Sequence, residues 1–167
     1  MFGPTRAEIQ QAASQTLDAT LAALFSPQPI PAPPVGPTPP LQAGQTWVNS
    51  AYDATYDGSF GAYLKAWWLG LMTKQGMSLH EKMVLFWHNH FVSEYVDIQD
   101  SRFMYKQLDL FRRNALGNFK QLVKLVTLDP AMLRYLNSNT NIVGHANENY
   151  GRELQELLTI GKGAEIA

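Results

Sequence analysis

The sequence predicts an all-α protein, an irregular bundle of about six helices with a proline-rich extended loop near its beginning. Apolar residues recur at the spacing of one helix face in most segments after residue 58. Residues that cap helices, and glycines that end them, flank those segments. No stretch of useful length alternates apolar and polar residues as a half-buried strand does. With 167 residues, 46% of them apolar, the chain is long enough to bury a core.

The chain begins with one expected helix, followed by a long connection. Thr5 and Glu8 have the spacing of a capping box, and apolar residues then recur at helical spacing from Ile9 to Phe25. Residues 26–58 contain eight of the ten prolines. Because proline lacks an amide hydrogen and restricts its predecessor, helix and interior strand are excluded in the proline-rich part. We interpret it as a surface connection rather than a docking site for a proline-recognising partner.

The remaining helices are expected to follow one another at short intervals. Ser78 and Glu81 have capping-box spacing, and the helix they open continues to Phe91. Asp129 followed by Pro130 is typical of a helix start, because the first turn does not need the amide hydrogen that proline lacks. The other helices are predicted over residues 59–74, 100–115, 119–128 and 147–160, with a short one over 131–136.

Composition excludes several classes of partner. The formal charge of −1, with acidic and basic residues intermixed, gives no broad attraction for nucleic acid or for an anionic membrane. No apolar run approaches the roughly 20 residues of a membrane span, and the first ten residues do not resemble a signal peptide. The chain has no cysteine, so a divalent metal would need histidine, carboxylate or amide ligands.

The stretch FWHNHF, residues 86–91, places two histidines near the end of an expected helix. Side chains two residues apart on a helix point about 200° away from each other. His88 and His90 therefore cannot hold one metal ion unless the helix distorts between them. Glu94 follows His90 by four residues, a spacing that can present two ligands together. His80, in the first turn of the same helix, is expected to face solvent.

A second polar cluster lies in the last predicted helix. Glu148, Arg152 and Glu156 follow one another at intervals of four residues, which describes either a solvated face or one side of a buried network. Asn149 and Glu153 form a further polar pair on this helix. The segment Arg112, Arg113 and Asn114 offers guanidinium donors that could pair with these carboxylates in a buried Arg–Glu–His network.

Five stretches carry a family resemblance. They are FGPTRAEI at 2–9, FWHNHFV at 86–92, RRNALGNF at 112–119, LDPAMLRYL at 128–136 and HANENYGRELQELLTIG at 145–161. In this order they resemble the successive motifs of the bacterial family called domain of unknown function 1800. The sequence departs from the family pattern at Gly151, where alanine is usual; glycine costs about 1 kcal/mol in a helix.

The resemblance implies an organisation but no reaction. Members of the family are usually longer and commonly exported, so residues 1–167 are expected to be either a single all-α domain or the N-terminal part of a longer protein. The missing C-terminal part would then be a partner of this chain, and the periplasm or cell surface its location. The family has no established activity that could be carried over.

Three interpretations of the polar residues remain open. The leading one is structural: His88, His90, Glu148, Arg152 and Glu153 satisfy one another between helices. The second is a metal-assisted or acid–base enzyme of the cell envelope, such as a hydrolase. In it the catalytic side chains are His88 and Arg152, and the metal ligands are His90, Glu94, Glu148 and Glu153. The third is an envelope or surface binding module that uses the proline-rich tract, Trp47 and Tyr52.

Overall fold

The computed structural model describes residues 2–36 and 41–161, and it confirms the all-α prediction. Within these residues the chain is built from nine α-helices, a 3₁₀ turn and a π-helical segment, without a β-strand. Two isolated bridges join Val35 to Thr46 and Ile142 to His145. The α-helices are more numerous than expected, because the first predicted helix is divided in two and one short helix was not foreseen.

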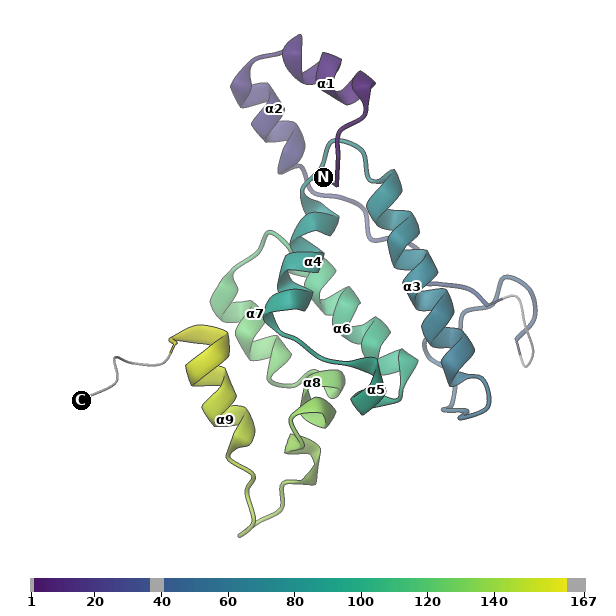
Figure 1. The fold of residues 1–167 in the computed structure, drawn as a ribbon, viewed down its shortest axis with the longest axis vertical. Coiled ribbons are helices and arrows are strands. Elements are labelled where there is room, and N and C mark those ends of the chain that lie inside the picture. The colour runs from purple at the N-terminus through teal and green to yellow at the C-terminus, as the bar shows by residue number, and fades with distance from the viewer. Residues whose placement is uncertain (1, 37–40, 162–167) are drawn as a thin grey trace.

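The first predicted helix is wrong in one respect, since two helices replace it. They are α1 (Arg6–Ala13) and α2 (Leu17–Leu24), which form a hairpin at one end of the molecule (Figure 1). The capping box is confirmed, with the Glu8 amide donating to Thr5 Oγ1 at 3.3 Å. The break follows from a second cap, because the Thr16 hydroxyl accepts from the Ala19 amide and starts a new helix.

The connection between α2 and α3 runs without a helix through its described residues, as predicted. Trp67 ties it to the bundle by donating from Nε1 to the Ala32 carbonyl at 3.0 Å. Trp47 is fully buried and stacks on Phe60 with ring centroids 5.2 Å apart. The prediction that Trp47 is an exposed contact is therefore wrong, while Tyr52 is indeed exposed.

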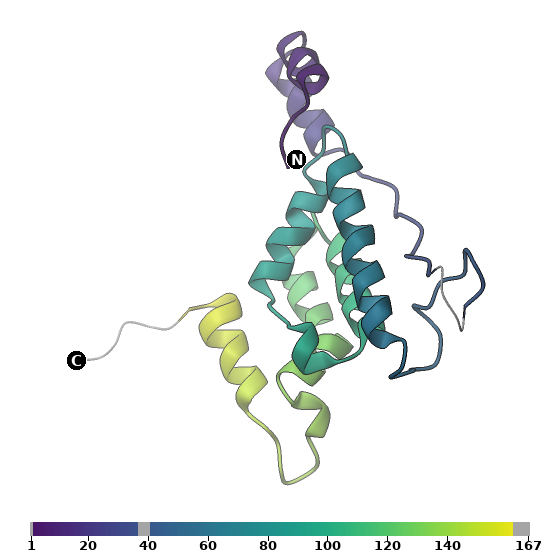
Figure 2. The same cartoon turned by 45° about the vertical axis from the view of Figure 1, so that its right-hand side comes forward.

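Three helices form the centre of the bundle. They are α3 (Asp57–Lys74), α4 (His80–His90) and α6 (Ser101–Arg113), which lie side by side in both ribbon views (Figures 1 and 2). The core between them and the shorter helices is apolar, with Val84, Phe91, Ile98, Phe111 and Val126 fully shielded from solvent. Burial of such side chains is the main stabilising contribution to a fold of this kind.

Shorter helices close the bundle. The unforeseen α5 (Tyr95–Ile98) follows α4, while α7 (Phe119–Val126) and α8 (Pro130–Tyr135) follow α6. Asp129 caps α8 as predicted, by accepting from the Met132 amide at 2.9 Å. Asn118, for which no cap was predicted, caps α7 by accepting from the Gln121 amide. These caps satisfy amides of the first turn that have no partner within the helix.

The last predicted helix is divided into two kinds of turn. A 3₁₀ turn, η1 (Ser138–Thr140), precedes α9 (Asn149–Glu153), which continues directly into the π-helical segment η2 (Leu154–Thr159). The wider turn is visible in the bond from the Ile160 amide to the Gln155 carbonyl, five residues back, at 3.1 Å. This helical arm lies at the side of the bundle (Figures 1 and 2).

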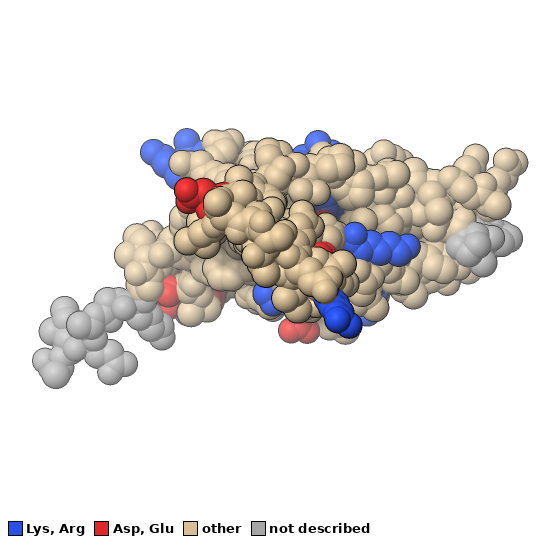
Figure 3. Space-filling model, turned by 90° about the horizontal axis from the view of Figure 1, so that it is seen from above, with Lys and Arg blue, Asp and Glu red and all other residues tan. Residues whose placement is uncertain are grey.

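Charge is scattered over the face of the molecule at the end that carries α1 and α2. On this face, acidic and basic side chains lie among mostly uncharged ones (Figure 3). In the described part of the chain, no helix has both the length and the apolar character needed to cross a bilayer.

Candidate functional site

A buried ion pair joins the three central helices. Arg112 of α6 donates from Nε to Glu81 Oε1 at 2.7 Å and from Nη2 to Oε2 at 3.0 Å. Trp68 of α3 donates from Nε1 to the same carboxylate at 3.0 Å. Trp67 adds its ring, whose centroid lies 4.9 Å from the guanidinium carbon. Only 1% of the Arg112 surface reaches solvent, so the two-pronged pairing replaces part of the hydration that the guanidinium has lost. Its second terminal nitrogen, Nη1, is buried and has no hydrogen-bond partner among the described residues.

The sequence analysis assigned both members of this pair to other partners. The predicted Ser78–Glu81 capping box is wrong: the Ser78 hydroxyl accepts from the His80 amide, and the Glu81 amide donates to Gln75 Oε1. Arg112 was expected to meet the carboxylates of the last helix and instead meets Glu81. The partners are 31 positions apart in the sequence and give no local spacing signal, because their contact depends on how α4 packs against α6.

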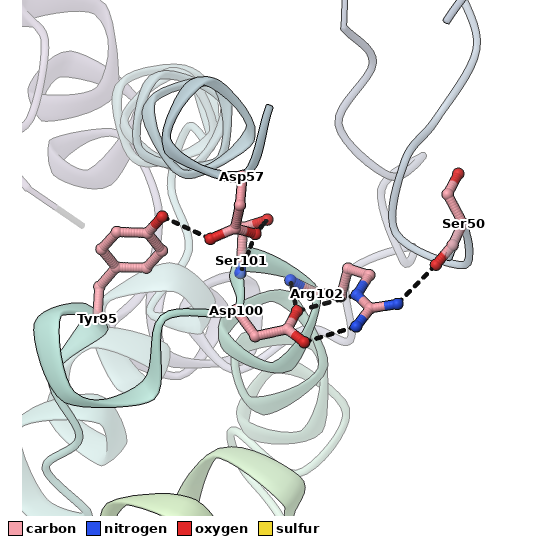
Figure 4. A network of polar contacts seen from close by, with 6 residues as sticks. All are labelled: Ser50, Asp57, Tyr95, Asp100, Ser101 and Arg102. Carbon is pink, nitrogen blue, oxygen red and sulfur yellow. Dashed lines mark hydrogen bonds and ion pairs between the residues drawn. The ribbon is translucent and has the colours of Figure 1, made fainter. Parts of the chain in front are cut away.

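A second buried network starts at the first residue of α3. Asp57 accepts from the Tyr95 hydroxyl at 2.6 Å, and from the amide and hydroxyl of Ser101 at 2.8 and 2.7 Å (Figure 4). Burial first, and then the bond to Asp57, raise the pKa of Tyr95. Asp100 pairs with Arg102, which also reaches the Ser50 carbonyl at 2.8 Å. The network fastens α5 and α6 to the start of α3.

A third chain of bonds crosses the core beneath α8. The Ser93 hydroxyl donates to Gln107 Oε1, and Gln107 Nε2 donates to Asp129 Oδ2 at 3.0 Å. The other oxygen of Asp129 is buried and has no hydrogen-bond partner among the described residues. Burial raises the pKa of Asp129 to about 6, although the hydrogen bonds that its carboxylate accepts act to lower this pKa. Ser93 and Gln107 were not singled out from the sequence. Asp129 was predicted only as a helix cap.

His88 lies in a pocket between α3, α5 and α6. This His88 pocket has a volume of about 430 Å³ and is lined mainly by apolar side chains, with Leu64, Trp68, Met104 and Leu108 among them. His88 makes no hydrogen bond to a described residue, and its ring nitrogens are not shielded from solvent. The ring lies 5.3 Å from that of Trp68 and 6.4 Å from that of Phe111. Burial lowers the pKa of His88, because it disfavours the charged form of the imidazole.

His90 points to another part of the molecule, as the helical spacing predicts. Its Nε2 donates to the Leu158 carbonyl at 2.8 Å, and its ring lies among Phe86, Phe91 and Phe119. Carbonyls in the last turn of a helix have no hydrogen-bond donor within that helix. His90 supplies such a donor for the Leu158 carbonyl of η2. The bond leaves His90 as a tie between α4 and the C-terminal helical arm.

The remaining predicted site residues are distributed over separate surfaces. Glu94 lines the His88 pocket, whereas Glu153 lines a different hollow beside Leu157. Glu148 and Arg152 line a third one, described below. The four predicted metal ligands are thus not brought together. In residues 2–36 and 41–161 no three histidine or carboxylate side chains lie close enough to hold a metal ion. The five-residue network of His88, His90, Glu148, Arg152 and Glu153 does not form either.

An open groove follows the C-terminal helical arm. This C-terminal groove has a volume of about 670 Å³, and its polar lining includes Asn141, Asn147, Glu148, Arg152, Gln155 and Glu156. Arg152 donates to Asn149 Oδ1 at 3.0 Å and to Glu153 Oε1 at 3.1 Å, with 55% of its side chain exposed. The charged stripe seen in the sequence is therefore solvated.

His80 differs from its prediction. It is half-buried, and neither ring nitrogen has a hydrogen-bond partner in the described part of the chain. The reason is the proline-rich connection, since Pro29 and Pro31 line the same small hollow. Burial lowers the pKa of His80. The negative charge of Glu81 acts to raise this pKa, and the positive charge of Arg112 acts to lower it.

Together these features define an all-α domain whose centre is held by buried polar contacts and whose pockets lie at its edges. The family model described as "Protein of unknown function (DUF1800)" matches residues 1–165. The chain therefore belongs to this family, as the motifs indicated. Searches of curated proteins and of solved structures found no match.

Proposed function

We propose that the chain is the helical domain of an acid–base enzyme, with His88 as the proton acceptor. The observation that carries the proposal is the state of this side chain. His88 has no hydrogen-bond partner among the described residues and keeps its nitrogens open to solvent, and burial lowers its pKa, which favours the neutral form. A free imidazole lone pair at neutral pH is what a general base requires.

The walls of the His88 pocket support a substrate class. They are mostly apolar, with charged groups contributed by Lys65 and Glu94. Ser93 and Tyr95, the hydroxyl residues of the pocket, are already engaged with Gln107 and Asp57. This composition favours a small substrate with an apolar body and one polar reacting group, such as an ester. His88 would take the proton from the water that attacks that group.

Hydrolysis of aryl acetate and butyrate esters tests this proposal. His88→Gln should lower the rate by at least about a hundredfold, the usual contribution of a general base. His145→Gln is the matched control, because His145 is an exposed histidine outside the His88 pocket and its loss should change nothing. Equal rates for the two variants would overturn the proposal for this substrate class.

The protonation of His88 can be followed without a substrate. Ring nitrogen signals in a nuclear magnetic resonance titration should place the pKa of His88 below 6.5, in the direction that burial imposes. A value at or above 6.5 would contradict the effect of burial on His88, and a value well above 7 would remove the neutral base on which the mechanism depends.

A purely structural role is the second candidate, and the Glu81–Arg112 pair favours it. In that case the polar motifs fix how helices cross, and the domain serves as a scaffold for the rest of a longer polypeptide. An inactive protein whose stability falls sharply when this pair is broken would support the scaffold. Export to the periplasm or cell surface stays a prediction from the family resemblance.

A further inference from the structure

We infer that the C-terminal groove binds a polyhydroxylated ligand, of which an oligosaccharide is the natural class. The inference does not depend on the His88 pocket, because the two sites share no lining residue. It starts from the polar groups that α9, η2 and the preceding loop bring to one open hollow of about 670 Å³.

The groove presents donors and acceptors whose capacity is not used within the chain. The side chains of Glu148, Gln155 and Glu156 make no hydrogen bond or ion pair with any residue in the described ranges. Asn147 uses its side-chain oxygen for the Asn149 amide, which leaves its amino group available. Arg152 uses one terminal nitrogen and keeps the others.

The mixture of charges selects the kind of ligand. Glu148 and Glu156 would repel an anion, and Arg152 between them in sequence opposes a cation. Carboxylates, amides and a guanidinium together offer both acceptors and donors in planar, two-pronged arrangements. Sugar hydroxyls each donate and accept, so adjacent hydroxyls can pair with both kinds of group. Leu133 and Tyr150 give the groove an apolar part for the sugar ring.

Gly151 provides a way to close the groove without touching its polar groups. It lines the hollow, and a Cβ atom added there meets no other atom within 4 Å. Its backbone is helical, so alanine fits, and both alanine and leucine have a higher helix propensity than glycine. Gly151→Leu should occupy the groove, while Gly151→Ala serves as the matched control.

The experiment is a titration with β-1,4-linked tetramers of glucose and of N-acetylglucosamine, followed by the side-chain amide signals of Asn147 and Gln155. Saturable shifts should appear in the native chain and in Gly151→Ala. Gly151→Leu and Gln155→Ala should each bind at least about tenfold more weakly, the effect of losing roughly 1.4 kcal/mol. His88→Gln should bind as the native chain does.

Two results would overturn the inference. One is the absence of shifts with either tetramer at about 10 mM, which excludes even weak specific binding. The other is equal binding by Gly151→Leu and Gly151→Ala, which would place the ligand elsewhere. Binding of one tetramer alone would support the inference and identify the sugar.

Discussion

The Glu81–Arg112 pair and the stripe of Glu148, Arg152 and Glu156 contain the same types of charged residue in opposite surroundings. The first is shielded by α3, α4 and α6 and by two tryptophan rings. The second lies along an open groove, where Arg152 is more than half exposed. Charges that are buried must be paired to be tolerated, whereas solvated charges remain available to a ligand. Burial, rather than residue type, separates structural from binding residues in this chain.

The largest expected effect breaks the buried pair. Arg112→Ala leaves the Glu81 carboxylate uncompensated in the core and should lower the free energy of unfolding by about 3 to 5 kcal/mol. Arg152→Ala removes an exposed pairing and should cost at most about 1 kcal/mol. Urea denaturation at pH 7 measures both.

A milder variant keeps this comparison measurable if Arg112→Ala does not fold. Arg112→Lys retains the charge and loses the two-pronged geometry, so its cost should lie between those of the two alanine variants. A smaller loss for Arg112→Lys than for Arg152→Ala would contradict the distinction between the two regions.

An intermediate effect concerns pH and the buried Asp129. Since the pKa of Asp129 is about 6 in the folded chain and 3.8 without burial, the folded state holds a proton that the unfolded state releases between these values. Stability from this group is therefore present below about pH 4 and lost as pH rises through 6, by roughly 2 to 3 kcal/mol.

Asp129→Asn isolates that contribution. Asparagine caps a helix as well as aspartate does, so α8 should persist while the proton linkage disappears. The difference in unfolding free energy between the native chain and the variant, measured from about pH 4 to 7, should change over this window. A constant difference would show that Asp129 does not titrate there.

The smallest expected effect is local. His90→Phe preserves an aromatic ring beside Phe119 and removes the bond to the Leu158 carbonyl. Global stability should fall by no more than about 1 kcal/mol, while amide hydrogen exchange in residues 154–161 should accelerate. Unchanged exchange there would mean that His90 does not hold the C-terminal helical arm in place.

The accuracy of the sequence predictions follows the range of each interaction. The caps at Thr5 and Asp129 depend on groups within three residues, and both were located correctly. The second cap at Thr16, which divides the first helix, was missed because apolar spacing continues across the break. Local patterns of this kind fix where helices are more reliably than where they end.

Local sequence patterns did not predict which residues of different helices meet. The helical spacing correctly separated His88 from His90, since it requires only the geometry of one helix. The predicted partner of Arg112 was wrong because the sequence contains several carboxylates that could pair with a guanidinium. Only the packing of α4 on α6 selects Glu81. His88 was named as a catalytic residue on its type alone, and the apolar pocket around it had no sequence signal.

The π-helical segment η2 has a consequence for how this arm tolerates insertions and deletions. A wide turn holds one residue more than an α-helical turn over the same length. Removing one residue from a regular α-helix would rotate the residues after it by about 100°. In 154–159 the wide turn can instead narrow to α-helical width, so Leu158, the one buried residue of this segment, would stay in the core with its carbonyl beside His90. This segment should therefore tolerate the loss of a single residue without presenting a different helix face to solvent.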